Sequence, residues 1–179
     1  MIKHHSFCFF LYLMLFIFIL IHPSCASTKN VTKLVDEVCA KASNYSFCIE
    51  SLYSDPQTPK SDTYGLAYVA FRLAYLNATS TRDYIEKLLK KANSSNRMHL
   101  QKCDSDYKKA VSAIETAYND LNSETFFELA DLAGDASHAA EDCQATIKGT
   151  HHSMIHFLSD SLKGLCEICV VISKLFTGS

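Results

Sequence analysis

Four cysteines in two pairs constrain this chain more than any other feature. Cys39 and Cys48 are separated by eight residues, Cys103 and Cys143 by thirty-nine, and all four lie in sequence with helical periodicity. Disulfides persist in oxidising compartments and are rare in the cytosol. Paired half-cystines on helices therefore predict a disulfide-linked helical bundle rather than a catalytic or metal site.

The start of the chain has the pattern of a cleaved secretory signal. Lys3 precedes an unbroken apolar run of 15 residues, 7–21, and Ala26 is a small residue at the expected cleavage point. The run is shorter than the roughly 20 apolar residues that cross a bilayer, and no other stretch approaches that length. We therefore predict a signal peptide, residues 1–26, and one mature domain, residues 27–179, without a membrane-spanning segment.

Charge and sequons agree with an extracellular protein. Loss of Lys3 lowers the net charge from −2 to −3, far from the basic balance that nucleic-acid binding requires. Four Asn-X-Ser/Thr sequons are candidate N-glycosylation sites: Asn30, Asn44, Asn77 and Asn93. A signal peptide followed by four sequons predicts a secreted eukaryotic glycoprotein.

Proline divides the mature domain into a short and a long helical part. Pro56 and Pro59, its only prolines, both lie in residues 54–61. Proline removes a backbone donor and disfavours helix before it, so this segment predicts a linker. No strand-like alternation occurs elsewhere, and we predict an all-α fold. Residues 27–60 are expected to form a helical hairpin and linker, and residues 61–179 a four-helix bundle.

The hairpin is expected to consist of helices at residues 30–43 and 45–53. Helices of this length are marginal alone in water. A bridge between Cys39 and Cys48 would close a ten-residue loop between them, contributing on the order of 3 kcal/mol in the chain-entropy model.

Four longer helices are expected after the linker. The first runs from about residue 62 to 92, with a restart at a capping box in residues 80–83. Ser123 and Glu124 open the third helix, and Gly149 ends it. The apolar face expected for the first helix is Leu66, Val69, Leu73 and Leu76.

The second cysteine pair fits two antiparallel helices. With a turn near residues 121–123, Cys103 lies about 19 residues before the turn and Cys143 about 20 after it, so a rise of about 1.5 Å per residue places them level. Their bridge would close a loop of 41 residues, worth on the order of 4 kcal/mol.

Two motifs with metal or redox spacing have a structural interpretation that we prefer. Cys166 and Cys169 lie inside the last amphipathic helix, without the strand of a redox motif or the second pair of a zinc site. We expect buried thiols. His152 and His156 are four residues apart, but no acidic partner follows at useful spacing, so a solvated helix start is favoured. No metal site and no cofactor are predicted.

Acid–base catalysis is equally disfavoured. Glu141 and Asp142 are adjacent, and neighbouring positions of a helix do not face each other. The chain also lacks a nucleophile elbow and a phosphate loop. We predict that the protein is not an enzyme and that it acts by binding through its surface; the residues alone do not identify the partner.

Several motifs together resemble the plant invertase and pectin methylesterase inhibitors. The motifs are the cysteine hairpin of residues 39–52, the linker with Asp55-Pro56, Cys103 with Asp106-Tyr107, and Asp135-Ala136-Ser137 leading to Glu141-Asp142-Cys143. The resemblance covers the mature chain, and within the family the similarity is greatest to the subgroup that contains a plane-tree pollen allergen.

The resemblance implies an up-down-up-down four-helix bundle preceded by a hairpin, with disulfides Cys39–Cys48 and Cys103–Cys143. It also implies reversible 1:1 inhibition of a carbohydrate-active enzyme of the apoplast or the vacuole, by coverage of the substrate cleft. Invertase inhibitors of the family carry Pro-Lys-Phe at the start of the third bundle helix. Here residues 123–128 read Ser-Glu-Thr-Phe-Phe-Glu. This departure favours pectin methylesterase as the target, with acid invertase as the alternative.

The same segment provides the candidate target interface. Phe126 and Phe127 lie where the helix is expected to begin, and an aromatic residue on a bundle rim is a plausible interface anchor. The structural alternative is that one of the two closes the end of the core.

Two other classes of secreted helical protein, saposin-like lipid binders and carriers of apolar ligands, are alternatives to an inhibitor. A saposin-like lipid binder would pair cysteines between the two ends of its domain, but residues 166–169 have no matching pair near Cys39. A carrier of an apolar ligand would need an internal cavity. Alanines on the helix seams predict close packing instead, at Ala110, Ala117, Ala136 and Ala139.

Overall fold

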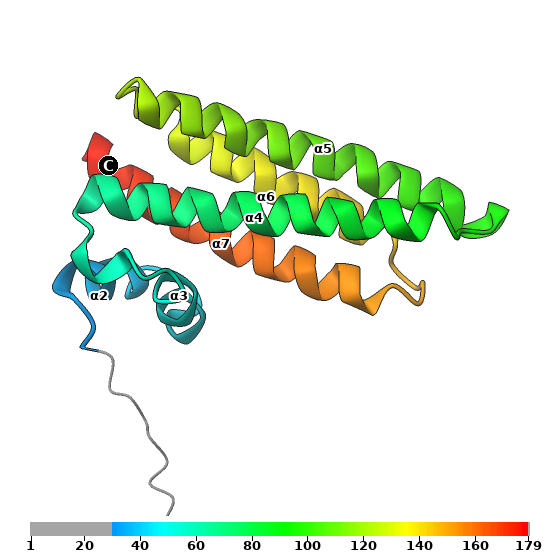
Figure 1. The fold of residues 1–179 in the computed structure, drawn as a ribbon, viewed down its shortest axis with the longest axis horizontal. Helices are drawn as coiled ribbons and strands as arrows, with labels where there is room; N and C mark the ends of the chain where they lie inside the picture. The colour runs from blue at the N-terminus through cyan, green and yellow to red at the C-terminus, as the bar shows by residue number, and fades with distance from the viewer. Residues whose placement is uncertain (1–29, 179) are drawn as a thin grey trace, which may run out of the picture. The chain divides into compact units, whose positions relative to one another are not determined.

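The computed structural model describes residues 30–178, and in this part all regular structure is helical (Figure 1). The predicted signal peptide, residues 1–26, lies outside the described residues. None of the helices in the described part is long and apolar enough to span a membrane. The elements are α2 (Lys33–Cys39), α3 (Tyr45–Leu52), the 3₁₀ turn η1 (Thr58–Lys60), α4 (Thr63–Leu89), α5 (Ser94–Asn122), α6 (Leu129–Thr146) and α7 (Ser153–Thr177).

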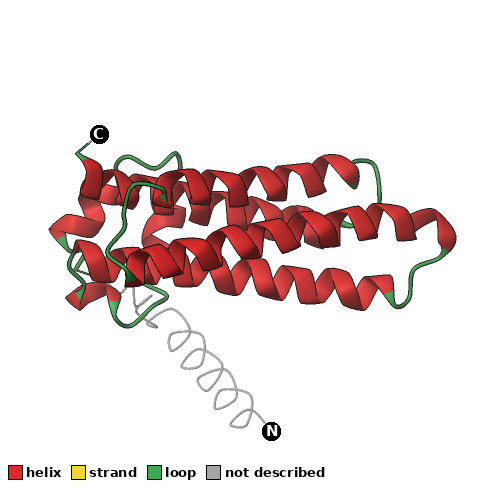
Figure 2. Ribbon diagram, turned by 90° about the horizontal axis from the view of Figure 1, so that it is seen from above, coloured by secondary structure: helices red, strands yellow, loops and turns green. Residues whose placement is uncertain are grey.

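Helices α4 to α7 form an up-down-up-down bundle, in which each long helix runs antiparallel to the next (Figures 1 and 2). Side-chain caps define two of the starts. Asp62 accepts from the backbone N–H of Gly65 at 2.8 Å before α4, and Asn93 accepts from that of Asn96 at 3.0 Å before α5. The predicted all-α bundle preceded by a hairpin is therefore confirmed.

Buried alanines line the helix seams and bring the helices close together. Tyr107 and Phe71 are the largest fully buried side chains. Small residues between such large ones allow the layers to interdigitate without voids. The buried alanines are Ala67, Ala70, Ala74, Ala78, Ala110, Ala117, Ala133, Ala136, Ala139 and Ala140.

The prediction for α4 was wrong in two respects. Leu76 is 53% exposed, while Ala74 and Ala78 on either side of it are buried. On α4, the leucines and the alanines form two different apolar stripes. The alanine stripe faces the bundle, because small side chains let the neighbouring helices pack closer to α4. The expected restart near residue 80 does not occur. Ser80 Oγ instead donates to the carbonyl of Asn77 at 3.0 Å, within one continuous helix.

The start of α6 also differs from the prediction. Ser123 and Glu124 end α5 rather than open the next helix, because Glu124 adopts φ +56°. The N–H of Thr125 then bonds to the carbonyl of Asp120 at 2.8 Å, and the N–H of Glu124 to that of Leu121 at 3.2 Å. This is a Schellman turn with glutamate at the position that usually carries glycine. Residues 123–128 are therefore a connection, and α6 begins at Leu129 and ends before Gly149.

Two disulfides tie the helices together. Cys39 and Cys48 join α2 to α3 with a Cα–Cα distance of 5.5 Å. Cys103 and Cys143 join α5 to α6 with a Cα–Cα distance of 4.4 Å. All four cysteines are fully buried, so both bridges lie in the core.

The hairpin of α2 and α3 is seated on the side of the bundle, mainly against α7. Phe47 lies directly over Gly164, where an added Cβ would be 2.5 Å from Phe47 Cε1. Ser43 donates its N–H and its hydroxyl to the two carboxylate oxygens of Glu167, at 2.8 and 2.7 Å. The close approach of the Phe47 ring to α7 therefore requires a residue without a side chain at position 164.

Candidate functional site

The His, Cys, Asp and Glu side chains of the described residues do not assemble a metal centre. No group of three or more His, Cys, Asp or Glu side chains in residues 30–178 could hold a metal ion. Cys166 and Cys169 are free and buried, and burial raises the pKa of Cys166 to about 12 and that of Cys169 well above its usual value. A thiol that stays protonated is a poor nucleophile and a poor metal ligand.

The histidines near the start of α7 are not arranged as metal ligands either. His152 precedes α7 and is half-buried, in contrast to the solvated start that we predicted. Its pKa is lowered, first by burial and then by the nearby His151 and His99. Its Nε2 atom is buried without a hydrogen-bond partner among the described residues. A function is therefore better sought on the surface of the bundle.

One candidate surface is the bundle end formed by the connection of residues 123–128. Phe126 points into this end, where its ring stacks on Phe176 at 4.4 Å with 10° between the planes and meets the edge of Tyr64 at 6.2 Å. Phe127 is 83% exposed. The structure thus separates the two predicted interface residues: Phe126 closes the end of the core, and Phe127 is free to contact a partner.

A row of tyrosines extends from this end along the seam between α4 and α5. The ring centroids are 5.0 Å apart for Tyr64 and Tyr68, 6.0 Å for Tyr68 and Tyr118, and 6.2 Å for Tyr118 and Tyr75. All four rings are half-buried. We call Tyr64, Tyr68, Tyr75 and Tyr118 the tyrosine row.

Hydrogen bonds fix the rings of the row in place. Tyr64 donates to the carbonyl of Leu121 at 2.6 Å, and Tyr75 donates to Glu115 Oε1 at 3.2 Å. Hydrogen bonding to Tyr64 raises the pKa of Tyr68 to about 12, and burial raises that of Tyr118 to about 12. The hydroxyls of Tyr68 and Tyr118 therefore remain neutral. The row presents rigid amphipathic rings of the kind enriched in protein interfaces.

The row borders a hollow of about 350 Å³, which reaches the linker between hairpin and bundle. Arg72 lines this hollow and forms an ion pair with Asp55, a buried residue of the linker. Spacing along α4 could have indicated the row, since Tyr64, Tyr68 and Tyr75 recur on one helical face. Tyr118 on α5 could not be placed beside them without the fold.

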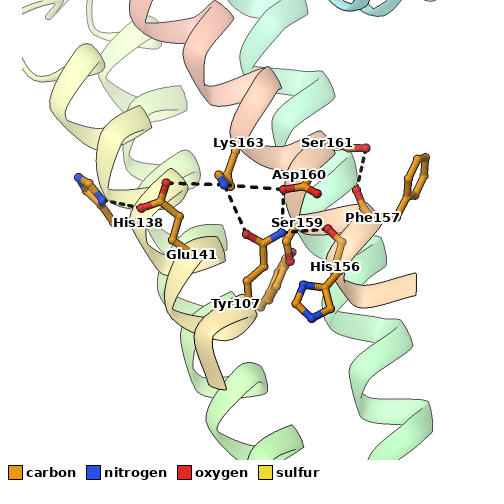
Figure 3. Close-up of polar contacts among 10 residues, drawn as sticks. Tyr107, His138, Glu141, His156, Phe157, Ser159, Asp160, Ser161 and Lys163 are labelled. Atoms are coloured by element: carbon orange, nitrogen blue, oxygen red, sulfur yellow. Dashed lines mark hydrogen bonds and ion pairs between the residues drawn. The ribbon is translucent and has the colours of Figure 1, made fainter. Parts of the chain in front are cut away.

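A second candidate surface lies between the hairpin and α7, on the side of Lys163. Lys163 Nζ lies 3.8 Å from Glu141 Oε1 and 3.7 Å from Asp160 Oδ1, and His138 Nδ1 lies 3.4 Å from Glu141 Oε2 (Figure 3). These are half-exposed surface pairs that contribute little energy individually. Glu141 thus takes part in a surface ion-pair network with Lys163 and His138.

The family model described as plant invertase/pectin methylesterase inhibitor matches residues 33–172. The chain belongs to this family. The match includes both cysteine pairs, helices α4 to α6 and most of α7, and it identifies the protein as a member of an inhibitor family rather than an enzyme.

The similar proteins include inhibitors of both target classes. A pectinesterase inhibitor of Actinidia deliciosa is 29% identical over 156 residues, 86% of this chain and 84% of that protein. A cell wall / vacuolar inhibitor of fructosidase from Arabidopsis thaliana is 31% identical over 103 residues, 56% of this chain and 57% of that protein. A Platanus orientalis protein named for invertase inhibition is 30% identical over 46% of this chain and 49% of its own length.

A solved structure supports the fold independently. The crystal structure of a mutant form of a pectin methylesterase inhibitor from Arabidopsis aligns with a TM-score of 0.72 at 21% identity, over 80% of this chain and 97% of that chain. At this level of identity the likeness concerns the fold alone.

Proposed function

We propose that the protein is a secreted inhibitor that forms a reversible 1:1 complex with a plant cell-wall enzyme and covers its substrate cleft. Pectin methylesterase is the favoured target and acid invertase the alternative. Secretion by a signal peptide at residues 1–26, into the apoplast or the vacuole, belongs to the same proposal.

The choice of target rests on the connection between α5 and α6, on its composition and on the direction of its aromatic side chains. Residues 123–128 contain neither proline nor lysine, and Phe126 is turned into the bundle. Phe127 is the large apolar side chain of this segment that is exposed. A probe of a narrow sugar site needs several specific polar groups, whereas a cover of a broad cleft needs an extended complementary face. The similarity to a pectinesterase inhibitor over 86% of the chain supports the same choice.

The tyrosine row and Phe127 supply such an extended face. Aromatic anchors held by neighbouring rings and hydrogen bonds lose little side-chain entropy on binding, so they are effective interface residues. The net charge of −3 expected for the mature chain is small, and long-range electrostatic steering should be modest.

The decisive experiment is titration of the purified protein into a plant pectin methylesterase and an acid invertase while product release is followed. We expect a 1:1 end point with the first enzyme. Phe127→Ala should weaken its inhibition about 10- to 30-fold, the equivalent of about 1.4–2 kcal/mol. Met98→Ala removes another highly exposed side chain, 71% exposed on α5, and should leave inhibition unchanged. Inhibition of invertase alone would reverse the order of the two targets.

Phe126→Ala provides the complementary measurement. Its ring packs between Phe176 and Tyr64, so its loss should lower stability by about 2 kcal/mol while inhibition of the folded protein persists. Should Phe126→Ala abolish inhibition at unchanged stability, the assignment of the two phenylalanines would be wrong.

A further inference from the structure

A groove of about 600 Å³ lies between the hairpin and α7, and we call it the hairpin groove. Its volume is within the roughly 300–1,000 Å³ that accommodates small-molecule ligands. The lining combines apolar and hydroxyl-bearing side chains. Phe47 and Phe157 provide aromatic surface, and Ser137 and Ser161 provide hydroxyls.

Phe157 is the unusual residue of the groove. Its ring is 65% exposed, and in Figure 3 it points away from the buried Tyr107–Ser159 pair. The exposed ring forms an apolar surface at the edge of the groove, next to the hydroxyl groups of Ser137 and Ser161. A pyranose sugar matches this lining, because its C–H face packs on an aromatic ring while its hydroxyls bond to polar groups at the rim.

The charges of the groove restrict the kind of sugar. Among the described residues that line it, Lys163 is the single Lys or Arg, and it lies near the carboxylates of Glu141 and Asp160. Glu167 also lines the groove and accepts from Ser43. An acidic sugar would therefore meet more negative than positive charge, so the groove favours a neutral sugar.

One source of neutral sugar is attached to the groove itself. Asn44 lines the hairpin groove and begins the sequon Asn44-Tyr45-Ser46. Its Oδ1 accepts from the N–H of Phe47 at 3.0 Å, which caps α3 and fixes the side chain. Its Nδ2 has no hydrogen-bond partner among the described residues, and Asn44 is exposed. A glycosylated amide keeps its Oδ1 acceptor, so the cap and the glycan are compatible.

We propose that Asn44 carries an N-glycan whose first sugars fold back into the hairpin groove and cover Phe157. Attachment is a group transfer from a lipid-linked oligosaccharide: C1 of the first sugar bonds to Asn44 Nδ2, its bond to the pyrophosphate of the donor breaks, and the amide loses a proton. The glycan then shields the side of α7 and leaves the tyrosine row as the accessible aromatic face. This inference rests on the proposed secretion and holds whichever enzyme is inhibited.

A second sequon provides a matched control. Asn93 also caps a helix through Oδ1, is exposed, and begins the sequon Asn93-Ser94-Ser95. It lies between α4 and α5, at the end of the bundle away from the hairpin (Figure 1). Asn93 is not among the residues that line the hairpin groove. Ser46→Ala and Ser95→Ala remove the two sequons and leave both capping asparagines in place.

The test is hydroxyl-radical footprinting of the full chain secreted from plant cells, with the glycosylated peptides mapped by mass spectrometry. Labelling of Phe157 should be about threefold slower in wild type than in Ser46→Ala, since pockets cover most of a bound surface. Ser95→Ala should match wild type at Phe157. Labelling of Met98, which lies near Asn93 on α5, should be equal in wild type and Ser46→Ala, because both keep the Asn93 sequon. Enzymatic removal of glycans from the folded wild-type protein gives the same comparison without a substitution.

Two outcomes would overturn the proposal. One is a secreted protein in which Asn44 is not glycosylated. The other is an occupied Asn44 with equal labelling of Phe157 in wild type, in Ser46→Ala and after glycan removal. Neither readout uses a target enzyme, so failure here leaves the proposed inhibition untouched.

Discussion

Two helical glycines should respond in opposite directions to the same substitution. Gly134 lies in the interior of α6, and an added Cβ there has no neighbour within 4 Å. Gly134→Ala should therefore stabilise the protein by about 0.5–1 kcal/mol, because alanine loses less backbone entropy on folding. For a domain of this size the gain corresponds to an increase in Tm of about 1–4 °C.

Gly164→Ala brings the same backbone gain but meets the hairpin. The new Cβ would lie 2.5 Å from Phe47 Cε1 and 3.1 Å from two further ring atoms. Carbon atoms pack best at about 3.5–4.0 Å, so the ring must move by roughly 1 Å. Overpacking of this kind costs about 1–3 kcal/mol. After the gain of about 0.5–1 kcal/mol is subtracted, we expect a net loss of roughly 1 kcal/mol and a difference between the two variants of about 1–3 kcal/mol.

The assay is denaturant unfolding followed by far-ultraviolet circular dichroism, with the disulfides intact. The double variant Phe47→Ala with Gly164→Ala isolates the steric contribution, because without the ring the second substitution should stabilise as it does at Gly134. If Gly164→Ala stabilises the otherwise wild-type protein as much as Gly134→Ala does, then Phe47 is not seated on Gly164 and the docking of the hairpin must be different.

Three further outcomes are expected. Glu124→Gly should be neutral or stabilising by up to about 1 kcal/mol, because a backbone φ of +56° is costly for glutamate. Glu124→Val should destabilise the protein in the same unfolding assay, because a β-branched residue tolerates this φ least. The lowered pKa of His152 means that the unfolded state binds more protons, so stability should fall as the pH drops below about 6.5. His152→Gln should flatten that slope. Cys166 and Cys169 should resist an aromatic disulfide reagent at pH 8 until the protein is unfolded, and rapid reaction of the native protein would show that they are accessible.

Much of the fold could be predicted from local patterns. Helical periodicity and the scarcity of proline identify the long helices, because both act over a few residues at a time. The level positions of Cys103 and Cys143 follow from the constant rise of two antiparallel helices. The inhibitor family could be recognised because its cysteines, linker and short motifs keep their order along the chain.

Features that depend on backbone conformation or on competing surfaces could not be predicted in this way. The turn at Glu124 lacks the glycine that normally marks a left-handed residue, so α6 was expected to begin too early. On α4, Leu76 and the alanines offered two apolar faces, and periodicity alone does not decide between them. The choice depends on which face brings the neighbouring helices into closest contact.

The candidate surfaces were decided by the tertiary structure. Phe126 and Phe127 are neighbours with the same chemistry, and only the packing of Phe176 and Tyr64 distinguishes the buried ring from the free one. The tyrosine row joins α4 to α5, and the hairpin groove joins residues near 44 to residues near 160. The sequence by itself determined which segments are helical and which cysteines can meet, because these depend on local spacing. Binding surfaces depend on contacts between distant segments, which only the folded chain brings together.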